Sequence, residues 1–443
     1  MKAKFLLLVS LFFVSIGFSQ KKWTLKECVD HALANNITIK QNSLNVDLAE
    51  LNVKNAKGNF LPSVSGSTGG NLRFGSGFDF VSNNRVSTTI YGGSIGVNSN
   101  ITLFNGYQNL NIYKQAQLGV ERSKLTLDKI QNDISLFVVN AYLRVLFAKE
   151  NLAVAQVQAE ISKKQVEAAK ERYGAGVIPK GDLLNVQSTA ANDQQNVIAN
   201  ENVLTIELLG LSQALQVPSK DFDVLGINVG TPSLALLYNN SEMVYQKALT
   251  NQPQIKNAEL DIKNAELGIE IAKGAYLPSI SGSFGLSTSY SFNLNLLPMQ
   301  TNSSFGSQLD NNLGYGVGFN VSIPIFNRTQ TKTNVARQFV NRESSKVALD
   351  NQKLQLQQTI EQAFVDSKAA AKTYEAASIS LEAQREAFKN AQESYNLGAM
   401  TLFDFDLVRN RLVSAESALI RAKYDYVFKT KVLQFYYGEL NLD

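Results

Sequence analysis

The chain carries the stretch AKGNFLPSVSGS at residues 56–67 and repeats it as AKGAYLPSISGS at residues 272–283. The match extends outward: residues 32–67 align with residues 248–283 with 18 identities in 36 positions. Further along, the offset between the copies grows from 216 to 222 residues, because the second copy has six extra residues. At the new offset the matches are Tyr173 with Tyr395, Gly176 with Gly398, and Asp182 with Asp404. A register held over such distances indicates a tandem duplication.

In both copies the hydrophobic period changes at this stretch. Residues 24–57 have apolar side chains near helical spacing and no proline, which predicts one helix. After the Gly58–Pro62 break the period becomes two, which predicts β-strands. The same pattern occurs four times, at about residues 63–74, 88–104, 279–292 and 312–326.

One face of each predicted strand is apolar and aromatic, and the other carries small, nearly uncharged Ser, Gly and Asn. This alternation is typical of transmembrane β-strands, with lipid on one side and water on the other. A half-buried sheet in a soluble sandwich is the alternative. A solvated sheet face normally carries Lys and Glu, however, so the sequence favours membrane strands.

Each strand pair is followed by a long proline-free stretch, at 107–172 and 329–394, and then by a shorter helix, at 182–216 and 404–437. A helix of about 66 residues spans roughly 100 Å and cannot be buried in one globule. We therefore expect the long helices to pack side by side as a coiled coil, with the shorter helices folding back antiparallel. Only 8 of 443 residues are proline, which fits such helices.

Residues 1–19 are predicted to be a secretory signal peptide. Lys2 and Lys4 precede the apolar run Phe5–Phe18, and a small-x-small cleavage site follows. An uncleaved N-terminal anchor is the alternative. The remaining chain divides into a first repeat at 20–225, a linker at 226–240 and a second repeat at 241–443.

The composition argues against catalytic and metal chemistry. The chain has one His and one Cys, whereas a structural zinc site needs four nitrogen or sulfur ligands. We interpret His31 and Cys28 as structural residues, and we expect no metal, no cofactor and no enzymatic activity. Without Lys2 and Lys4 the net charge is +2, which gives no sign of nucleic-acid binding.

Four membrane strands cannot close a barrel alone, since the smallest known barrels have about eight strands. Open edges in lipid would leave backbone groups without hydrogen bonds, so other chains must complete the sheet. Cyclic symmetry would give eight strands in a dimer or twelve in a trimer. Small polar residues on the inner face favour the larger barrel, which leaves room for a lumen.

Further motifs mark the ends of the predicted helices. They are WTLKEC at 23–28 with ALANN at 32–36, the echo ALTNQP at 248–253, LPS at 61–63 and 277–279, RYGAGV at 172–177 and YNLGA at 395–399. On these motifs the chain resembles the outer-membrane efflux protein family, the TolC-like trimeric channels. The resemblance implies an α+β membrane protein with a long antiparallel α-helical coiled-coil barrel in the periplasm. As a homotrimer it would complete a twelve-stranded β-barrel in the outer membrane.

The resemblance also implies a function and partners. Such channels are passive exit ducts of tripartite efflux or type I secretion systems, and they dock onto a periplasmic adaptor and an inner-membrane pump. The alternatives are a freestanding porin, which has no need of the long helices, and a secreted coiled-coil structural or adhesive protein, which has no need of lipid-type strands.

The resemblance further implies a periplasmic gate at the helix tips. Tyr395 matches the family's gate tyrosine, Asp404 matches one gate carboxylate, and Asp182 is its partner on the neighbouring hairpin. Met400 stands where the family has an arginine, and a methionine cannot form an ion pair with Asp182. We therefore hypothesise that Met400, Leu402 and Phe403 close the entrance by hydrophobic contact. Adaptor contacts are expected at the exposed tips, formed by Gly174, Gly176, Val177, Gly398 and Ala399.

Overall fold

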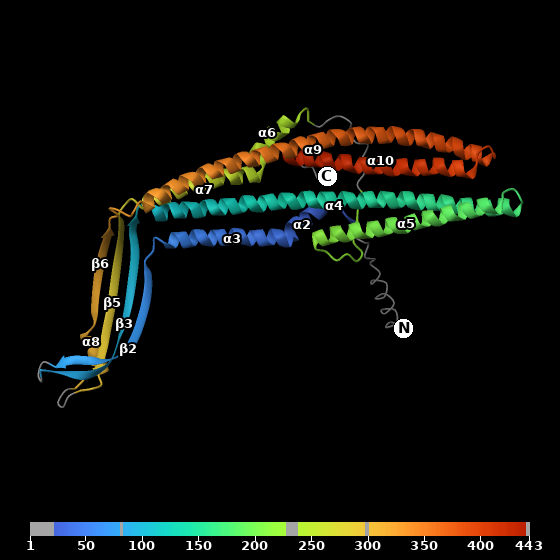
Figure 1. Cartoon of the computed structure of the whole chain (residues 1–443). Helices are drawn as coiled ribbons and strands as arrows, with labels where there is room; N and C mark the ends of the chain where they lie inside the picture. Colours follow the sequence, from blue (N-terminus) through green and yellow to red (C-terminus); the bar gives the residue numbers. More distant parts are fainter. Residues whose placement is uncertain (1–21, 80–82, 227–237, 297–300, 440–443) are drawn as a thin grey trace, which may run out of the picture. The chain divides into compact units, whose positions relative to one another are not determined.

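The computed structural model describes residues 22–79, 83–226, 238–296 and 301–439 (Figure 1). The predicted signal peptide and most of the predicted linker lie outside these residues. The chain forms two compact units, and each unit takes segments from both copies of the repeat. One contains the residues up to Leu44, Leu125–Lys256 and the chain from Asp350 onward; the other contains Asn45–Lys124 and Asn257–Leu349. The compact units therefore cut across the sequence repeats.

The second unit contains an antiparallel sheet, whose strands run side by side in Figure 1. Its strands are β2 (Ser63–Asp79), β3 (Asn84–Asn105), β5 (Ser279–Asn293) and β6 (Gly314–Ser322), in the spatial order β2-β3-β5-β6. Strands β3 and β5 come from different copies, so the sheet joins the two repeats. Among the described residues, β2 and β6 have a strand neighbour on one side only.

The strand register sorts the side chains onto two faces. Leu72 pairs with Tyr91, and Tyr91 pairs with Phe292 on its other side. One residue further along, Asn71 pairs with Gly92, which pairs with Ser291. Paired residues share a face of a sheet, so the apolar residues of all four strands gather on one face and the small polar residues on the other. Many of the apolar side chains are exposed: Val64, Phe74, Tyr315, Val317 and Phe319 are examples.

The fourth strand is shorter than the sequence predicted. The predicted strand 312–326 is reduced to Gly314–Ser322, and Pro324 lies just beyond its end. Proline has no amide hydrogen for the ladder, which is one reason for a strand to stop there. Before β6, the short helix α8 (Phe305–Asn311) lies against β5. Next to it, the Asn312 side-chain amide donates to the Ser289 carbonyl at 2.7 Å.

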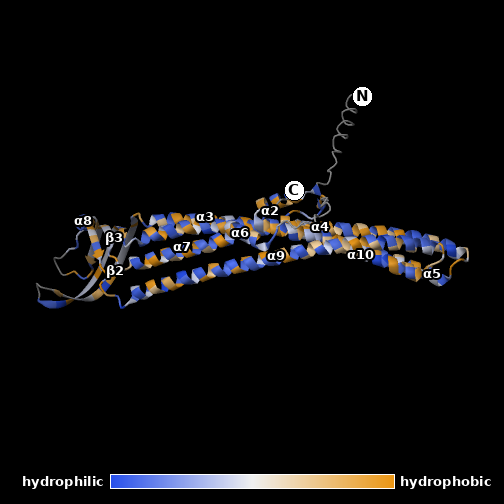
Figure 2. Cartoon of the chain, turned by 90° about the horizontal axis from the view of Figure 1, so that it is seen from above, coloured by the Kyte–Doolittle hydropathy of each residue, from blue (hydrophilic) through white to orange (hydrophobic). Residues whose placement is uncertain are grey.

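The long helices of both copies form hairpins with the helices that follow them (Figure 1). The first hairpin consists of α4 (Gln108–Gly174) and α5 (Lys180–Leu215), and the second of α9 (Gln330–Asn396) and α10 (Leu402–Tyr437). Hydrophobic and hydrophilic residues alternate along these helices in Figure 2. None of the described helices has the length and apolar character needed to cross a membrane.

The prediction of one continuous helix over residues 24–57 was wrong. Two helices, α2 (Leu25–Asn35) and α3 (Ile37–Gly58), are separated at Asn36, whose side chain accepts a hydrogen bond from the Thr38 amide at 2.8 Å. The second copy breaks at the matching place, between α6 (Ser241–Asn251) and α7 (Pro253–Gly274). There Gln252 precedes a proline, which disfavours helical backbone at Gln252.

The first unit has a hydrophobic core that anchors the N-terminal segment. Strand β1 (Lys22–Trp23) pairs in parallel with β4 (Asp223–Val224), and the buried Tyr142 of α4 packs beneath them. The Tyr142 hydroxyl lies 2.6 Å from the Leu225 carbonyl and 3.1 Å from the Trp23 carbonyl. Burial raises the pKa of this hydroxyl, so it stays protonated and serves as a donor. Cys28 is fully buried in the same core.

Candidate functional site

Both helical hairpins turn in the same way at their tips. Gly176 and Gly398 adopt positive φ angles of 73° and 76°, a conformation that costs glycine little. In each turn the next amide, of Val177 or Ala399, donates to the carbonyl five residues earlier at 2.9 Å. This arrangement satisfies the last carbonyls of α4 and α9 and reverses the chain. The turns place the predicted contact residues on exposed tips, with Gly174 as the last residue of α4.

At the second tip, Tyr395 belongs to an aromatic stack. Its ring lies 4.9 Å from the ring of Phe405 at an angle of 16°, and Phe405 in turn lies 5.6 Å from Phe388. The guanidinium carbon of Arg172, at the end of α4, lies 5.7 Å from the Tyr395 ring centroid. Arg172 also donates to the Asn396 carbonyl at 3.5 Å. The tyrosine predicted for the gate thus binds a cation from the opposite hairpin.

A cavity of about 1000 Å³ lies between the tips. It brings together three of the four predicted gate residues, Asp182, Tyr395 and Met400, along with Arg172. Met400 and Asp182 are half-buried in its wall. Asp404 does not line it. Side chains of both hairpins form this wall, so a change in the distance between the hairpins changes the size of the cavity.

Asp404 is hydrogen-bonded to the residue that caps its helix. Its amide donates to the Thr401 hydroxyl at 3.2 Å, and its carboxylate accepts from the same hydroxyl at 2.6 Å. Thr401 is therefore the N-cap of α10, and the exposed carboxylate of Asp404 lies in the first turn, where the helix dipole favours a negative charge. Asp182 occupies the matching place in the first turn of α5. The N-cap residue of α5 is Pro179, whose side chain makes no hydrogen bond to the helix.

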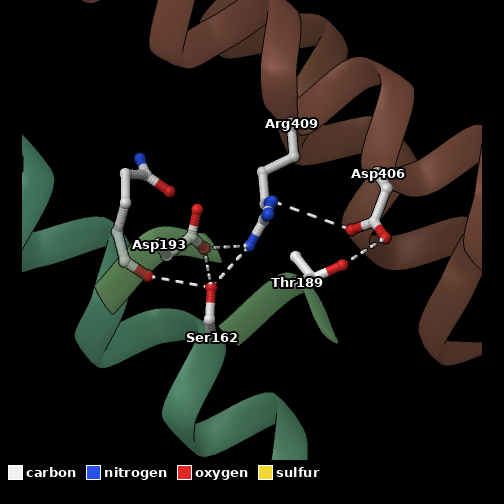
Figure 3. Close-up of polar contacts among 6 residues, drawn as sticks. Ser162, Thr189, Asp193, Asp406 and Arg409 are labelled. Carbon is white, nitrogen blue, oxygen red and sulfur yellow. Dashed lines mark hydrogen bonds and ion pairs between the residues drawn. The ribbon is translucent and has the colours of Figure 1, made fainter. Parts of the chain in front are cut away.

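A buried polar network joins the two hairpins just behind the tips (Figure 3). Arg409 of α10 is 2% exposed, and its Nη1 donates to the Ser162 hydroxyl of α4 at 2.6 Å and to Asp193 Oδ2 of α5 at 3.0 Å. The Ser162 hydroxyl donates to the same Asp193 carboxylate. Arg409 Nε lies 3.7 Å from Asp406 Oδ1, and Asp406 Oδ2 accepts from the Thr189 hydroxyl at 3.5 Å. One arginine therefore links three helices.

The electrostatics of this network depend on the arginine. Burial raises the pKa of the Asp406 carboxyl above its ordinary value, and the charge of Asp193 adds to the rise. The charge of Arg409 and the hydrogen bond from Thr189 oppose it. Among the described residues, Arg409 is the one charged residue that is buried. A buried arginine that loses its partners is costly, so the network constrains how the helices pack.

Sequence reasoning missed Arg409, Asp193 and the role of Arg172. A signal for Arg409 exists, because it interrupts the apolar stripe of α10. Residues at helical spacing along this stripe are buried; they include Phe405, Leu412, Ala415, Ala422 and Tyr426. A charged residue in such a stripe needs a partner from another helix. The sequence does not say which helix supplies it.

Within the described part of the chain, no group of three or more His, Cys, Asp or Glu residues is placed to hold a metal ion. The site consists instead of a sheet with one exposed apolar and one small polar face, and of helical hairpins with exposed tips.

Comparison with known proteins identifies this architecture. The family model described as "Outer membrane efflux protein" matches residues 28–216 and 244–439. The chain belongs to this family. Among its relatives, the outer membrane efflux protein BepC of Brucella suis is 23% identical over 425 residues, covering 95% of this chain and 86% of BepC. The outer membrane protein TolC of Escherichia coli is 21% identical over 439 residues, covering 96% of this chain and 84% of TolC.

The fold agrees with the sequence relationship. The Campylobacter jejuni CmeC outer membrane channel superposes with a TM-score of 0.75 at 18% identity, covering 94% of this chain and 86% of CmeC. The predicted fold class is therefore confirmed as that of the family's channels. The protein is an outer-membrane channel with a periplasmic helical domain and serves as an exit duct for efflux or secretion, as the sequence predicted. The matched family consists of channel proteins.

Proposed function

We propose that this efflux protein works as a homotrimer, in which three four-stranded sheets close one twelve-stranded barrel in outer-membrane lipid. The sheet carries the proposal: its apolar face is exposed, its other face is small and polar, and β2 and β6 each lack a neighbour on one side among the described residues. Pairing β6 of one copy with β2 of the next would satisfy both edges. The apolar face would then meet lipid, and the polar face would line the lumen.

Exposed apolar seams on two helices support the same assembly. Helix α3 exposes Leu44, Leu48 and Leu51, at spacings of four and three residues. Helix α9 exposes Val340, Val347 and Leu354, at intervals of seven residues. These spacings are those of coiled-coil seams. α3 leads into β2 and α9 follows β6, so neighbouring copies that pair their strand edges would also bring these seams together.

The tips would form the periplasmic entrance. Around a threefold axis, the exposed Val177, Leu397 and Phe403 of three copies, which are 69%, 85% and 78% exposed in one chain, would lose water on contact. Their exposure and the half-buried Met400 support closure by hydrophobic contact. Asp182 and Asp404 would add carboxylates near that contact, and Tyr395 would hold the second tip in shape.

The exposed turns are the proposed docking surface for a periplasmic adaptor, which would couple the duct to an inner-membrane pump. Gly174, Gly176, Val177, Gly398 and Ala399 leave the tip backbone open to an approaching helix. Transport through the duct would be passive, with energy supplied by the pump, and nucleic acid would not be among the partners.

The mass of the purified protein in detergent tests this assembly. We expect three chains per particle, and a cysteine pair placed on the outer edges of β2 and β6 should cross-link between chains. A monomer, or a dimer with eight strands, would contradict the proposal. Capture of the adaptor by the wild-type channel, and its loss when bulky residues replace Gly174 and Ala399, which are exposed and do not have positive φ angles, tests the docking surface.

A further inference from the structure

We infer that Arg409 holds the periplasmic entrance closed, by joining the two hairpins of each chain through one carboxylate on either side. The inference deepens the proposed function, on which it rests, and gives the gate an ionic link inside the protein in place of one at the tip. Position 400, where the resembled family has its gate arginine, is a methionine here.

The position of the network supports this role. Arg409 lies in the third turn of α10, counted from Leu402, so it is close to the tip but behind the aromatic stack of Tyr395 and Phe405. Its partners Ser162 and Asp193 are on the two helices of the other hairpin. The second hairpin therefore cannot move away from the first near the entrance without breaking these hydrogen bonds.

The charge pattern makes the contact between the hairpins depend on the guanidinium of Arg409. Asp193 is on the first hairpin and Asp406 on the second, and Arg409 lies within 3.0 Å of one and 3.7 Å of the other. Without the guanidinium, two carboxylates would face each other across the contact between hairpins. Their repulsion in a partly buried setting would favour separation of the hairpins. Arg409 thus decides whether the two hairpins attract or repel each other at this contact.

The internal duplication shows that the network is not a by-product of the repeat. At the offset of 222 residues, Arg409 and Asp406 correspond to Gln187 and Leu184 in the first copy. Ser162 and Asp193 correspond to Gln384 and Ala415 in the second copy. None of the four residues has an equivalent that could make the same contact. The link therefore occurs once per chain and gives the two hairpins different roles.

Single-channel recording of the purified wild-type channel in planar bilayers, against Arg409→Met, tests the inference. Methionine keeps an unbranched side chain of similar length and removes the charge. We expect the ratio of open to closed time to rise by about tenfold or more, because breaking a buried ion pair is strongly destabilising. Arg411→Met removes an exposed charge two residues along the same helix and should leave gating unchanged. The charge exchange Arg409→Asp with Asp193→Arg should restore part of the closure.

Further measurements separate a gating role from a folding role. If Arg409→Met fails to assemble, Asp193→Asn retains the arginine and the packing volume and should open the channel to a smaller degree. A cysteine pair at Thr189 and Asp406, joined by a short cross-linker, should hold the entrance closed until the link is cleaved. Unchanged gating in an assembled Arg409→Met channel, or in the cross-linked channel, overturns the inference. A wild-type protein that is no trimer or does not conduct would instead contradict the proposed function.

Discussion

Arg172 lies over the aromatic ring of Tyr395, with its guanidinium carbon 5.7 Å from the ring centroid. Arg172 is near the end of α4 and Tyr395 near the end of α9, so the contact joins the tips of the two hairpins. The resemblance to the efflux family predicted a gate tyrosine without an arginine, because Met400 stands at the arginine's place. The structure supplies a cation to this tyrosine from the other hairpin.

Replacing Arg172 by alanine should weaken the closed tip. A cation–π contact at an exposed site contributes about 0.5–1 kcal/mol, so we expect the open-to-closed ratio to rise about two- to fivefold. Bilayer recording measures this ratio. Lys170→Ala, which removes an exposed charge from the same helix, is the matched control. An Arg172→Ala channel that opens no more often than this control would show that the contact has no part in closure.

Asp404→Asn should reduce block of the channel by trivalent cations added on the periplasmic side. Three carboxylates around the axis would attract multivalent cations, and asparagine removes their charge while it can still accept a hydrogen bond from Thr401. Asp404→Ala should also loosen the start of α10. If neither conductance nor cation block changes in Asp404→Ala, the carboxylate only stabilises the first turn of α10.

Arg73 is expected to influence ion selectivity. Among the strand residues whose side chains are described, it is the one charge on the small polar face, where it pairs with Ile90. Arg73→Ser should lower the anion-to-cation permeability ratio, roughly twofold, as read from the reversal potential in a salt gradient. Arg85 pairs with Phe78 and so lies on the opposite face. Arg85→Ser should leave the ratio unchanged, and an equal effect of both variants would mean that the polar face is not the lumen.

Gly93→Ala should impair assembly of the sheet. A Cβ at this position would overlap the Gly69 carbonyl oxygen and lie 2.7 Å from the Tyr290 hydroxyl, and the backbone oxygen cannot move aside cheaply. Such overpacking costs about 1–3 kcal/mol. The yield of assembled channel in outer-membrane extracts measures the loss. Gly75→Ala, in the same sheet with nothing within 4 Å of the added carbon, should give the wild-type yield.

Asp223→Asn should destabilise the helical unit at neutral pH but not in strong acid. Burial alone would raise the pKa of the Asp223 carboxyl, but the hydrogen bonds from Lys149 and the Val224 amide, with the charges of Lys149 and Lys22, bring it below its ordinary value. A lowered pKa stabilises the folded state above the unfolded value of about 4, and this contribution disappears as the pH falls through the folded pKa.

We expect the free energy of unfolding of the wild-type protein to exceed that of the Asp223→Asn variant by about 1 kcal/mol at pH 7, given the partial exposure of the ion pair. Denaturant unfolding at several pH values measures this difference. A difference that stays constant down to about pH 2, well below the unfolded pKa, would show that the carboxylate charge is not its source.

Local patterns in the sequence were enough to predict most helices and strands and the two faces of the strands. Period-two alternation follows from strand geometry alone, so the side chains near Leu72 and Tyr91 could be assigned to one face before any contact was known. The tip turns could be predicted because Gly176 and Gly398 follow the ends of helical patterns. The break at Asn36 was missed, because one residue with extended backbone hardly disturbs helical spacing on either side.

The sequence by itself determined the duplication, the strand and helix classes and the family, because each rests on residues that are near in the chain or related by a fixed offset. Only the tertiary structure decided which charges meet: Arg409 is 216 residues from Asp193 and 247 from Ser162. The physical reason is that a buried charge must be neutralised by whatever side chain packing places beside it. Helical periodicity shows that Arg409 faces inward, and the packing of α4, α5 and α10 alone selects its partners.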